Sequence, residues 1–236
     1  MNTPSPEGQG PLVPTPAEPL PNTVLDTVLV AALSAIGRLP PALAEADRRW
    51  TARRSTSPRR LVRPGPTGAD LSRMLQAALS APDHGALRPW RVIEFRAEDR
   101  AALAALFEAE KLRRDPLATP LDLQRARAHA VEVPMLLAFV VSPRHKAQVP
   151  VREQWLGAGA SLGNLLNAAH EMGFGAIVLS GERCHDVQLT QALGLQPHEA
   201  LAGFVCLGSL LARPPTRPLA DPRAVHSRWR PPASRG

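Results

Sequence analysis

The sequence of 236 residues contains no tyrosine, and aromatic side chains make up only 4% of it. Its two cysteines are Cys184 and Cys206. Two cysteines cannot build the disulfide framework of a small secreted domain, and neither belongs to a CxxC pair or a Cys/His cluster of the kind that holds zinc. The side chains of adjacent Cys184 and His185 would diverge at a helix start. We therefore expect no metal site and a reducing, intracellular setting, and we predict a cytoplasmic protein.

Long hydrophobic runs are also absent. The longest apolar stretch, Val24–Ile36, is interrupted by Asp26 and Thr27 and is shorter than the roughly 20 residues of a transmembrane helix. Residues 1–21 hold seven prolines and no basic segment, so they do not have the pattern of a signal peptide. The sequence thus predicts no membrane partner.

Proline, by contrast, is abundant, with 26 residues that gather near both ends of the chain. We interpret residues 1–23 as a disordered proline-rich arm and residues 213–236 as a proline- and arginine-rich tail. Residues 24–212 then form one folded domain, of which residues 24–52 are an N-terminal helical extension. This length is ample for a hydrophobic core.

The net charge is +7, and only two of the 28 basic residues are lysines. Much arginine, alanine and proline with little lysine is typical of a GC-rich coding sequence, although a nucleic-acid-binding protein is an alternative. The run Arg48–Arg63 contains seven arginines and no acid, but Trp50 is its only aromatic residue. Proteins that bind single strands interleave basic and aromatic side chains. We therefore rank nucleic acid last among the expected partners.

Helical and strand patterns alternate within residues 24–212. Thr67–Ala81 has the clearest helical pattern, because Thr67 can cap it with Asp70 and apolar residues recur at helical spacing. Pro134–Val141 is almost continuously apolar, as in a strand buried on both faces. The other expected helices cover residues 24–36, 42–51, 98–110, 119–131, 153–172 and 185–193, and the other expected strands cover residues 90–95, 176–180 and 202–208.

These elements predict an α+β fold with a central mixed or antiparallel sheet between layers of helices. No GxGxxG follows a strand and no GxxxxGK[ST] occurs, which argues against a Rossmann or P-loop domain. The helix expected over residues 153–172 carries small side chains at 157–161 and 163. Such a surface allows another backbone or a flat ring to approach closely, so tight helix packing and a shared dimer core are both open.

Two segments contain residues suited to ligand binding. Arg53-Arg54-Ser55 leads into a Pro/Gly-rich loop, and an arginine fork with a neighbouring hydroxyl pairs well with phosphate. His84 lies in a short loop between the helix that ends at Ala81 and the strand that begins at Trp90. A histidine there can donate to a carbonyl or a phosphate. A solvated loop is the alternative for both segments.

Several short motifs occur in a characteristic order. Pro66-Thr67-Gly68, Ala81-Pro82-Asp83-His84 and Pro89-Trp90 follow the Arg-Arg-Ser triplet, and then come Val149-Pro150 with Glu153-Gln154, Gly173-Phe174-Gly175, Leu179-Ser180-Gly181, and Gly203-Phe204 with Leu207-Gly208. In this order and spacing, residues 53–221 closely resemble the FMN-dependent nitroreductase superfamily, in particular its branch of small NAD(P)H nitroreductases.

The resemblance implies a nitroreductase-like fold in which two subunits interlock as a homodimer with two flavin sites at the interface. It assigns Arg53, Arg54 and Ser55 to the FMN phosphate and ribityl chain, and it places His84 near the flavin. It also implies that Val178–Gly181 contact the flavin from the partner subunit.

Other assignments involve departures from the family pattern. Val178 and Leu179 stand where this branch has Trp-Arg before Ser180 and Gly181, and Ser80 stands at an arginine position beside the flavin. The helix end from Ala168 to Gly173 matches a region assigned to NAD(P)H.

The function implied by the resemblance is an FMN-dependent oxidoreductase, with NAD(P)H as electron donor and a small electron-poor acceptor such as a nitroaromatic or a quinone. The cofactor supplies the chemistry, with ping-pong turnover, so we expect no catalytic side-chain set. Backbone N–H groups near the flavin would stabilise its reduced anion. An alternative is a nitroreductase-fold protein that has lost flavin binding and acts as a binding or scaffold module.

Overall fold

The computed structural model describes residues 45, 49, 51–146, 148–215 and 218–231. The chain divides into two units, residues 1–47 and residues 48–236. The expected proline-rich arm over residues 1–23 and the expected helix over residues 24–36 lie outside the described residues. Almost all of the structure described below therefore belongs to the second unit.

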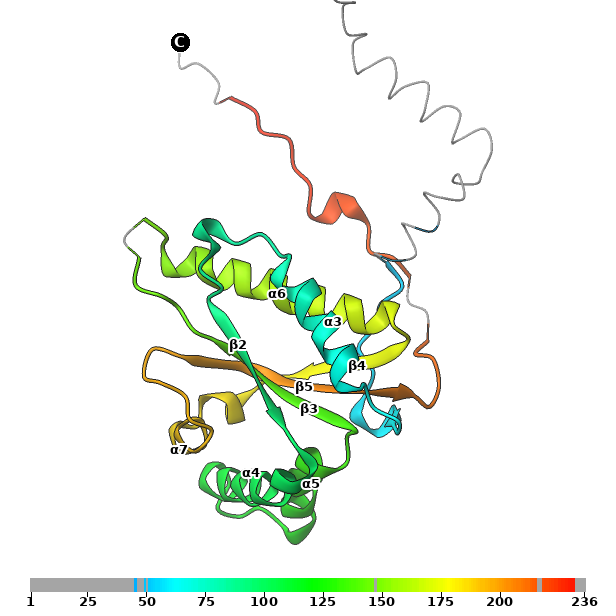
Figure 1. Ribbon diagram of the computed structural model, residues 1–236, viewed down its shortest axis with the longest axis vertical. Helices are drawn as coiled ribbons and strands as arrows, with labels where there is room; N and C mark the ends of the chain where they lie inside the picture. Colours follow the sequence, from blue (N-terminus) through cyan, green and yellow to red (C-terminus); the bar gives the residue numbers. More distant parts are fainter. Residues whose placement is uncertain (1–44, 46–48, 50, 147, 216–217, 232–236) are drawn as a thin grey trace, which may run out of the picture. The chain divides into compact units, whose positions relative to one another are not determined.

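A five-stranded antiparallel sheet forms the centre of this unit (Figure 1). The long strand β5 (Ala200–Leu210) pairs with β3 (Met135–Val141) on one edge and with β4 (Phe174–Leu179) on the other. β2 (Trp90–Phe95) pairs with the outer edge of β3. The short β1 (Leu61–Val62) pairs with the last two residues of β5. β4 therefore has one edge that no named strand covers.

Two helices cover one face of the sheet, namely α3 (Gly68–Leu79) and α6 (Val151–Glu171), and they lie side by side (Figure 1). Their buried side chains pack against alternate residues of the sheet, among them Leu137 and Phe139 of β3. We call this the α3/α6 face. Because Leu79 and Leu156 are exposed, the outer side of this layer is not entirely polar.

The opposite face carries α4 (Arg100–Arg114), α5 (Pro120–Val131) and the short α7 (Val187–Ala192) (Figure 1). Here Leu136 and Ala138 of β3 meet Phe107 of α4, whose ring lies edge-on to Phe204 of β5. We call this the α4/α5 face. β3 alternates between the two cores, which explains its continuous apolar sequence and confirms the expected buried strand.

Local signals define several helix ends as expected. Thr67 and Thr119 each form a capping box, with Asp70 and Asp122 as the reciprocal partners. Gly173, with φ of 85°, follows the end of α6, and Gly194, with φ of 75°, follows α7. Glycine adopts this left-handed conformation without the steric cost that a Cβ would add.

Two expectations about the elements need correction. About four strands were expected, and the structure has a fifth, β1, inside the arginine-rich run. The helix expected over residues 98–110 begins at Arg100 and continues to Arg114. Arg100 is buried and donates to the carbonyl oxygens of Ala130 and Val133 at the end of α5. Within the described residues, no helix is long and apolar enough to cross a membrane.

Candidate functional site

The Arg-Arg-Ser segment is attached to the open edge of β4. Ser55 forms a parallel bridge with Ala176, and the Thr56 N–H donates to the Ala176 carbonyl oxygen over 2.9 Å. Gly175 permits the close packing there, because a Cβ at that position would lie 2.6 Å from Cδ2 of Leu61 and 2.5 Å from Cδ2 of Leu210. The segment therefore has a defined position against the sheet.

Two cavities adjoin this segment and share Arg53, Arg54 and Thr56. The first, of about 620 Å³, is also lined by Ser55 and Arg60. The second, of about 900 Å³, extends to the end of α6 and to the residues that follow β5; it is also lined by Leu166, His170, Glu171, Gly173, Phe174, Gly175, Ala176 and residues 209–214. Two half-buried guanidinium groups thus stand beside a space large enough for a phosphate-bearing cofactor.

Sequence reasoning missed Arg213, which lines the larger cavity. The sequence places it at the start of the proline- and arginine-rich tail over residues 213–236. The available signal was its position three residues after β5, because β5 pairs with β4 and ends beside the Arg-Arg-Ser segment. Thr56 was also missed. It is 2% exposed, and its Oγ1 atom has no hydrogen-bond partner among the described residues.

The free edge of β4 offers backbone donors beyond the bridge at Ala176. Because the Ala176 carbonyl points to this edge, the backbone groups of Val178 and the N–H of Ser180 point to the same side, since strand residues alternate. Neither N–H has a hydrogen-bond partner within the part of the chain that the structure describes. Gly181 ends the strand with φ of 148°, a conformation that favours glycine. This edge can therefore donate hydrogen bonds to a bound ligand.

Ser80 and His84 lie between α3 and β2 and line neither of the two cavities. Ser80 ends α3, and its hydroxyl donates to the Ala77 carbonyl oxygen over 2.8 Å. The Nδ1 atom of His84 lies 2.8 Å from Oε2 of Glu153, in the first turn of α6. Along α6, the pair of His84 and Glu153 lies about 20 Å from Leu166, the lining residue of the larger cavity nearest to it on this helix, and about 30 Å from Gly173 at the other end. Within one chain, Arg53, Arg54 and Ser55 lie together against β4 at Ala176, but Ser80 and His84 do not line the same cavities.

The side of α6 that faces away from the sheet carries an exposed stripe of apolar and small residues. Trp155 is 43% exposed and Leu156 74%. Gly159 and Ala160 are also exposed, and no atom outside the helix backbone lies within 4 Å of a Cβ placed on Gly159. Ala168, further along the helix, is half-buried. Exposed apolar surface of this kind marks interaction sites.

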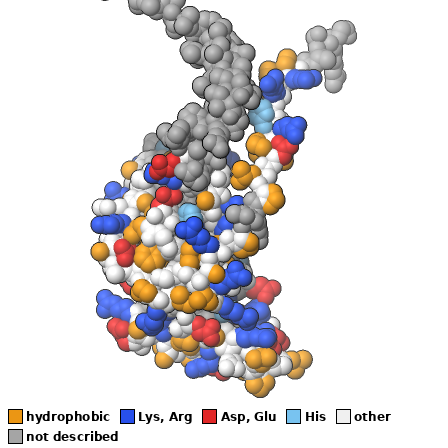
Figure 2. All heavy atoms as spheres, turned by 90° about the vertical axis from the view of Figure 1, so that its right-hand side faces the viewer, with side chains coloured by type: hydrophobic (Ala, Val, Ile, Leu, Met, Phe, Trp, Pro, Cys, Tyr) orange, Lys and Arg blue, Asp and Glu red, His pale blue; other side chains and the backbone are white. Residues whose placement is uncertain are grey.

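The other candidate chemistries receive little support from the described residues. Both cysteines are buried; burial raises the pKa of Cys184, and it raises the pKa of Cys206 to about 12. Such thiols are protonated at neutral pH and are therefore poor nucleophiles. No group of three or more His, Cys, Asp or Glu side chains that could hold a metal occurs in the described part. Figure 2 shows basic side chains spread over one face among acidic and hydrophobic ones.

Comparison with known proteins places these features in context. The model of the nitroreductase family matches residues 51–209. A protein of Escherichia coli strain K12 named putative NAD(P)H nitroreductase YdjA is 31% identical over 157 residues, which cover 66% of this chain and 84% of that protein. Putative NAD(P)H nitroreductase YfhC of Bacillus subtilis is 30% identical over 138 residues, covering 57% of this chain and 70% of that protein.

Solved structures show the same fold. A nitroreductase-like family protein from Bacillus cereus superimposes with a TM-score of 0.63 at 19% identity, covering 78% of this chain and 95% of that one. A nitroreductase from Desulfovibrio desulfuricans, solved in complex with FMN, superimposes with a TM-score of 0.58 at 22% identity, covering 82% and 100% of the two chains. The α+β arrangement with an antiparallel sheet between helices is therefore the arrangement found in nitroreductases.

Proposed function

This chain belongs to the nitroreductase family, an oxidoreductase family, and from that premise we propose that it is an FMN-dependent enzyme that uses NAD(P)H to reduce a small electron-poor acceptor. Nitroaromatics and quinones are the proposed acceptor class, and ping-pong turnover in one pocket is the proposed order. FMN supplies the hydride chemistry when bound. The protein must then bind, orient and shield it.

The observation that carries the proposal is the pairing of half-buried arginines with an open strand edge. Arg53 and Arg54 line both cavities, and Arg213 joins them in the larger one. Guanidinium groups recognise phosphate by paired hydrogen bonds, so these residues would hold the phosphate end of FMN. The buried Thr56 hydroxyl, which lacks a partner among the described residues, fits a site that a ligand completes.

Backbone N–H groups at the open edge of β4 make FMN binding less dependent on the side chains at positions 178 and 179, where this chain departs from the family pattern. The N–H groups of Val178 and Ser180 point to the open edge whatever side chains stand at positions 178 and 179. Donors of this kind stabilise negative charge where it develops. We therefore propose that FMN binding survives the replacement of Trp-Arg by Val178 and Leu179.

The separation of the site residues supports a homodimer. FMN is shorter than about 20 Å from standard bond lengths, whereas His84 lies about 20 Å along α6 from Leu166 at the near end of the cavity that contains Arg53 and about 30 Å from Gly173 at its far end. A twofold arrangement of two chains with antiparallel α6 helices would bring His84 of one chain to the cavity of the other. The small side chains of the exposed stripe on α6 would permit that approach.

This arrangement revises which residues the partner supplies. The resemblance places Val178–Gly181 on the partner subunit, but Ser55 bridges Ala176 within one chain. We therefore propose that Val178–Gly181 serve the flavin of their own chain and that Ser80 and His84 come from the partner. Gly173 lines the larger cavity, and with Ala168 it remains the proposed NAD(P)H region. The cytoplasmic location remains a prediction.

The absorption spectrum of the purified protein tests this function. We expect a yellow dimer whose flavin band is bleached by NADH or NADPH without oxygen and returns when a quinone or a nitroaromatic is added. A colourless protein that takes up no added FMN would instead support the scaffold alternative. If NADH or NADPH bleaches the band but neither acceptor restores it, the protein is a flavoprotein and the proposed acceptor class is wrong.

A further inference from the structure

A third cavity, of about 260 Å³, lies on the α4/α5 face, away from the arginines of the Arg-Arg-Ser segment. Its floor consists of buried apolar side chains, including Phe107, Leu136 and Phe204. Leu179, Ser180 and Gly181 at the end of β4 form one wall. The volume equals that of roughly eight or nine waters at about 30 Å³ each, so a ligand with about nine non-hydrogen atoms would fit.

Polar groups gather at one side of this apolar floor. Arg114, His129, Glu182 and Arg183 complete the lining. Burial lowers the pKa of His129, and the nearby cations Arg183 and Arg59 lower it further, against an opposing effect of Glu132. Arg183 thus contributes positive potential at this side of the cavity, whereas the acid Glu182 is paired with Arg114. An apolar floor with cationic groups beside it suits a ligand that has one apolar part and one anionic part.

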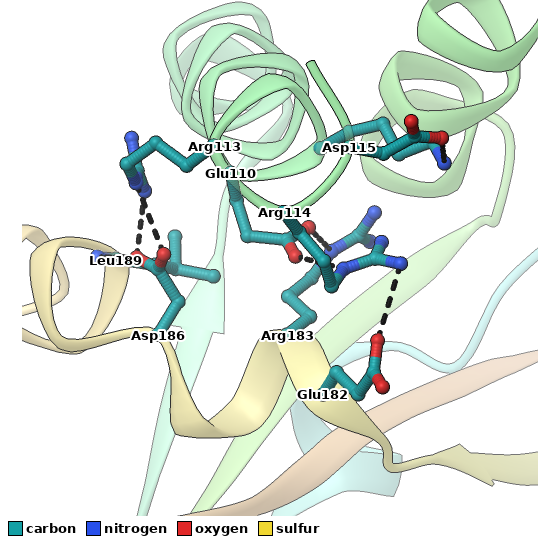
Figure 3. A network of polar contacts seen from close by, with 9 residues as sticks. Glu110, Arg113, Arg114, Asp115, Glu182, Arg183, Asp186 and Leu189 are labelled. Carbon is teal, nitrogen blue, oxygen red and sulfur yellow. Dashed lines mark hydrogen bonds and ion pairs between the residues drawn. The ribbon is translucent and has the colours of Figure 1, made fainter. Parts of the chain in front are cut away.

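Arg183 is held in place by a buried acid (Figure 3). Glu110 is 1% exposed, and its Oε2 accepts from Nε of Arg183 over 2.9 Å while its Oε1 accepts from Nε of Arg114 over 2.7 Å. The Arg183 guanidinium also lies 4.1 Å above the centre of the Phe107 ring. These contacts from two sides fix the orientation of the guanidinium.

The terminal nitrogens of Arg183 are not used by this network. Glu110 engages only its Nε atom, and no other hydrogen-bond acceptor contacts the Arg183 side chain within the described residues. Buried ionic groups are often no more stabilising than apolar ones of similar volume. Stability alone therefore does not account for a buried glutamate that orients an arginine beside an apolar cavity.

Arg113 provides a contrast on the same helix. Its Nε and Nη2 atoms donate to the two carboxylate oxygens of Asp186 over 3.0 and 2.6 Å, which satisfies the fork of the guanidinium (Figure 3). Arg113 does not line the cavity. Of these two arginines, only Arg183 combines a fixed orientation, terminal donors without a partner among the described residues, and a place in the cavity wall.

We propose that this cavity is a second ligand site, which binds a small organic carboxylate whose apolar body rests on Phe107, Leu136 and Phe204 and whose carboxylate pairs with the terminal nitrogens of Arg183. Bidentate pairing with a carboxylate is the interaction that an arginine fork makes best. The cavity shares Leu179–Gly181 with the proposed flavin site but none of the arginines at its proposed phosphate end, and the carboxylate proposal does not require that FMN binds.

Benzoate is the probe, because it joins a carboxylate to an aromatic ring of suitable size. Isothermal titration of the full-length protein, loaded with FMN if the protein binds it, should show saturable benzoate binding. Benzamide keeps the ring but lacks the charge, and acetate keeps the charge but lacks the ring. Each should bind about tenfold more weakly or worse, equivalent to about 1.4 kcal/mol. Failure of benzoate to bind, or equal binding of benzamide, would overturn the proposal.

Three variants locate the binding. Arg183→Lys keeps a cation for Glu110 but removes the fork, and it should weaken benzoate binding by about tenfold or more. Arg113→Lys is the matched control, and Arg53→Ala tests the other cavity; both should leave affinity within about twofold. Loss of binding in Arg53→Ala but not in Arg183→Lys would place benzoate in the proposed flavin site and contradict the inference. If Arg183→Lys lowers the melting temperature strongly, the benzamide comparison on the unaltered protein decides.

Discussion

The two faces of the sheet carry helices of similar construction but opposite surface chemistry. On the α4/α5 face, acidic and basic side chains pair with one another, as Glu110 does with Arg114 and Arg183. On the α3/α6 face, the outer side of α6 exposes small and apolar side chains such as Leu156 and Gly159. Within the described residues, the ion pairs of α6 lie at the two ends of the helix, at Glu153 and Glu171.

This difference indicates what each face meets. The α4/α5 face also exposes apolar side chains, among them Leu112, Leu121 and Val131, but these stand among charges that pair within the chain. A layer with an exposed stripe of small residues can accept a second copy at close range. We therefore propose that a dimer forms through the α3/α6 face, whereas the charges of the α4/α5 face pair within the chain.

The largest expected effect comes from placing charge on the exposed stripe of α6. Gly159→Arg should leave the monomer folded, because nothing lies within 4 Å of an added Cβ. In a dimer it would bury an unpaired guanidinium, which costs several kcal/mol, so the dissociation constant should rise about 100-fold or more. Sedimentation velocity measures this. Ala105→Arg, at an exposed position of α4, is the control and should remain a dimer; the reverse pattern would exchange the roles of the two faces.

The next effect concerns the buried acid of the α4/α5 face. Glu110→Ala leaves Arg114 and Arg183 without their common partner, and it should lower the free energy of unfolding by about 2–3 kcal/mol. This lies below the usual cost of breaking a buried pair because Arg114 is 37% exposed. Urea unfolding checks it. Glu153→Ala on the other face removes an exposed pair and should cost less than about 0.5 kcal/mol.

The Glu110 effect should also depend on pH. Burial would raise the pKa of Glu110, but hydrogen bonds from Arg114 and Arg183 outweigh it and the pKa is lowered. A lowered pKa in the folded state stabilises the protein above the usual carboxyl range, and this contribution is lost as pH falls through that range. The stability difference between the protein and Glu110→Ala should therefore shrink on acidification. A difference that grows would contradict the assigned charge.

A smaller effect on FMN affinity distinguishes an arginine that lines the proposed phosphate site from one that lies elsewhere in the arginine-rich run. Arg53→Ala should weaken FMN binding by about tenfold or more, since Arg53 lines both cavities of the proposed phosphate site. Arg63 is exposed and lines neither cavity. Arg63→Ala should therefore change the affinity by less than about twofold, as measured by flavin fluorescence. Equal losses would mean that the arginine-rich run acts as diffuse charge.

The smallest effect tests whether the faces differ in helix construction at all. Thr67 caps α3 on one face and Thr119 caps α5 on the other, each with the same capping box. Thr67→Ala and Thr119→Ala should each cost about 1 kcal/mol in thermal unfolding. A difference above about 0.5 kcal/mol between them would show that the contrast extends beyond the surface side chains to the helices themselves.

Features encoded by neighbouring residues were predictable from the sequence. The capped helix at Thr67, the buried strand at Pro134–Val141 and the glycine that follows α6 each depend on residues a few positions apart. The strand β1 was not predictable, because its two apolar residues among arginines are too few to show the alternation of a strand. The Glu110–Arg183 pair was not predictable because 73 residues separate its partners, and the packing of α4 against the 3-10 turn Glu182–His185 brings them together.

The site was predictable in the same measure. Arg53, Arg54 and Ser55 are proposed from residue type and order, and the structure places Ser55 beside Ala176 of β4, with all three residues lining one cavity. Arg213 depends on where β5 ends relative to β4, which its own neighbourhood in the sequence does not reveal. The separation of His84 from these residues likewise follows from the length of α6 rather than from any motif.

A mixed dimer tests most directly whether two copies share each flavin site. One chain carries Arg53→Ala and the other His84→Ala, with different affinity tags, and FMN bound by the purified mixed dimer is measured by absorbance. If each site joins Arg53 of one chain to His84 of the other, the mixed dimer contains one intact site and should bind about one FMN, whereas both variant homodimers bind FMN weakly. Binding as weak as that of the two homodimers would show that each site is formed by a single chain.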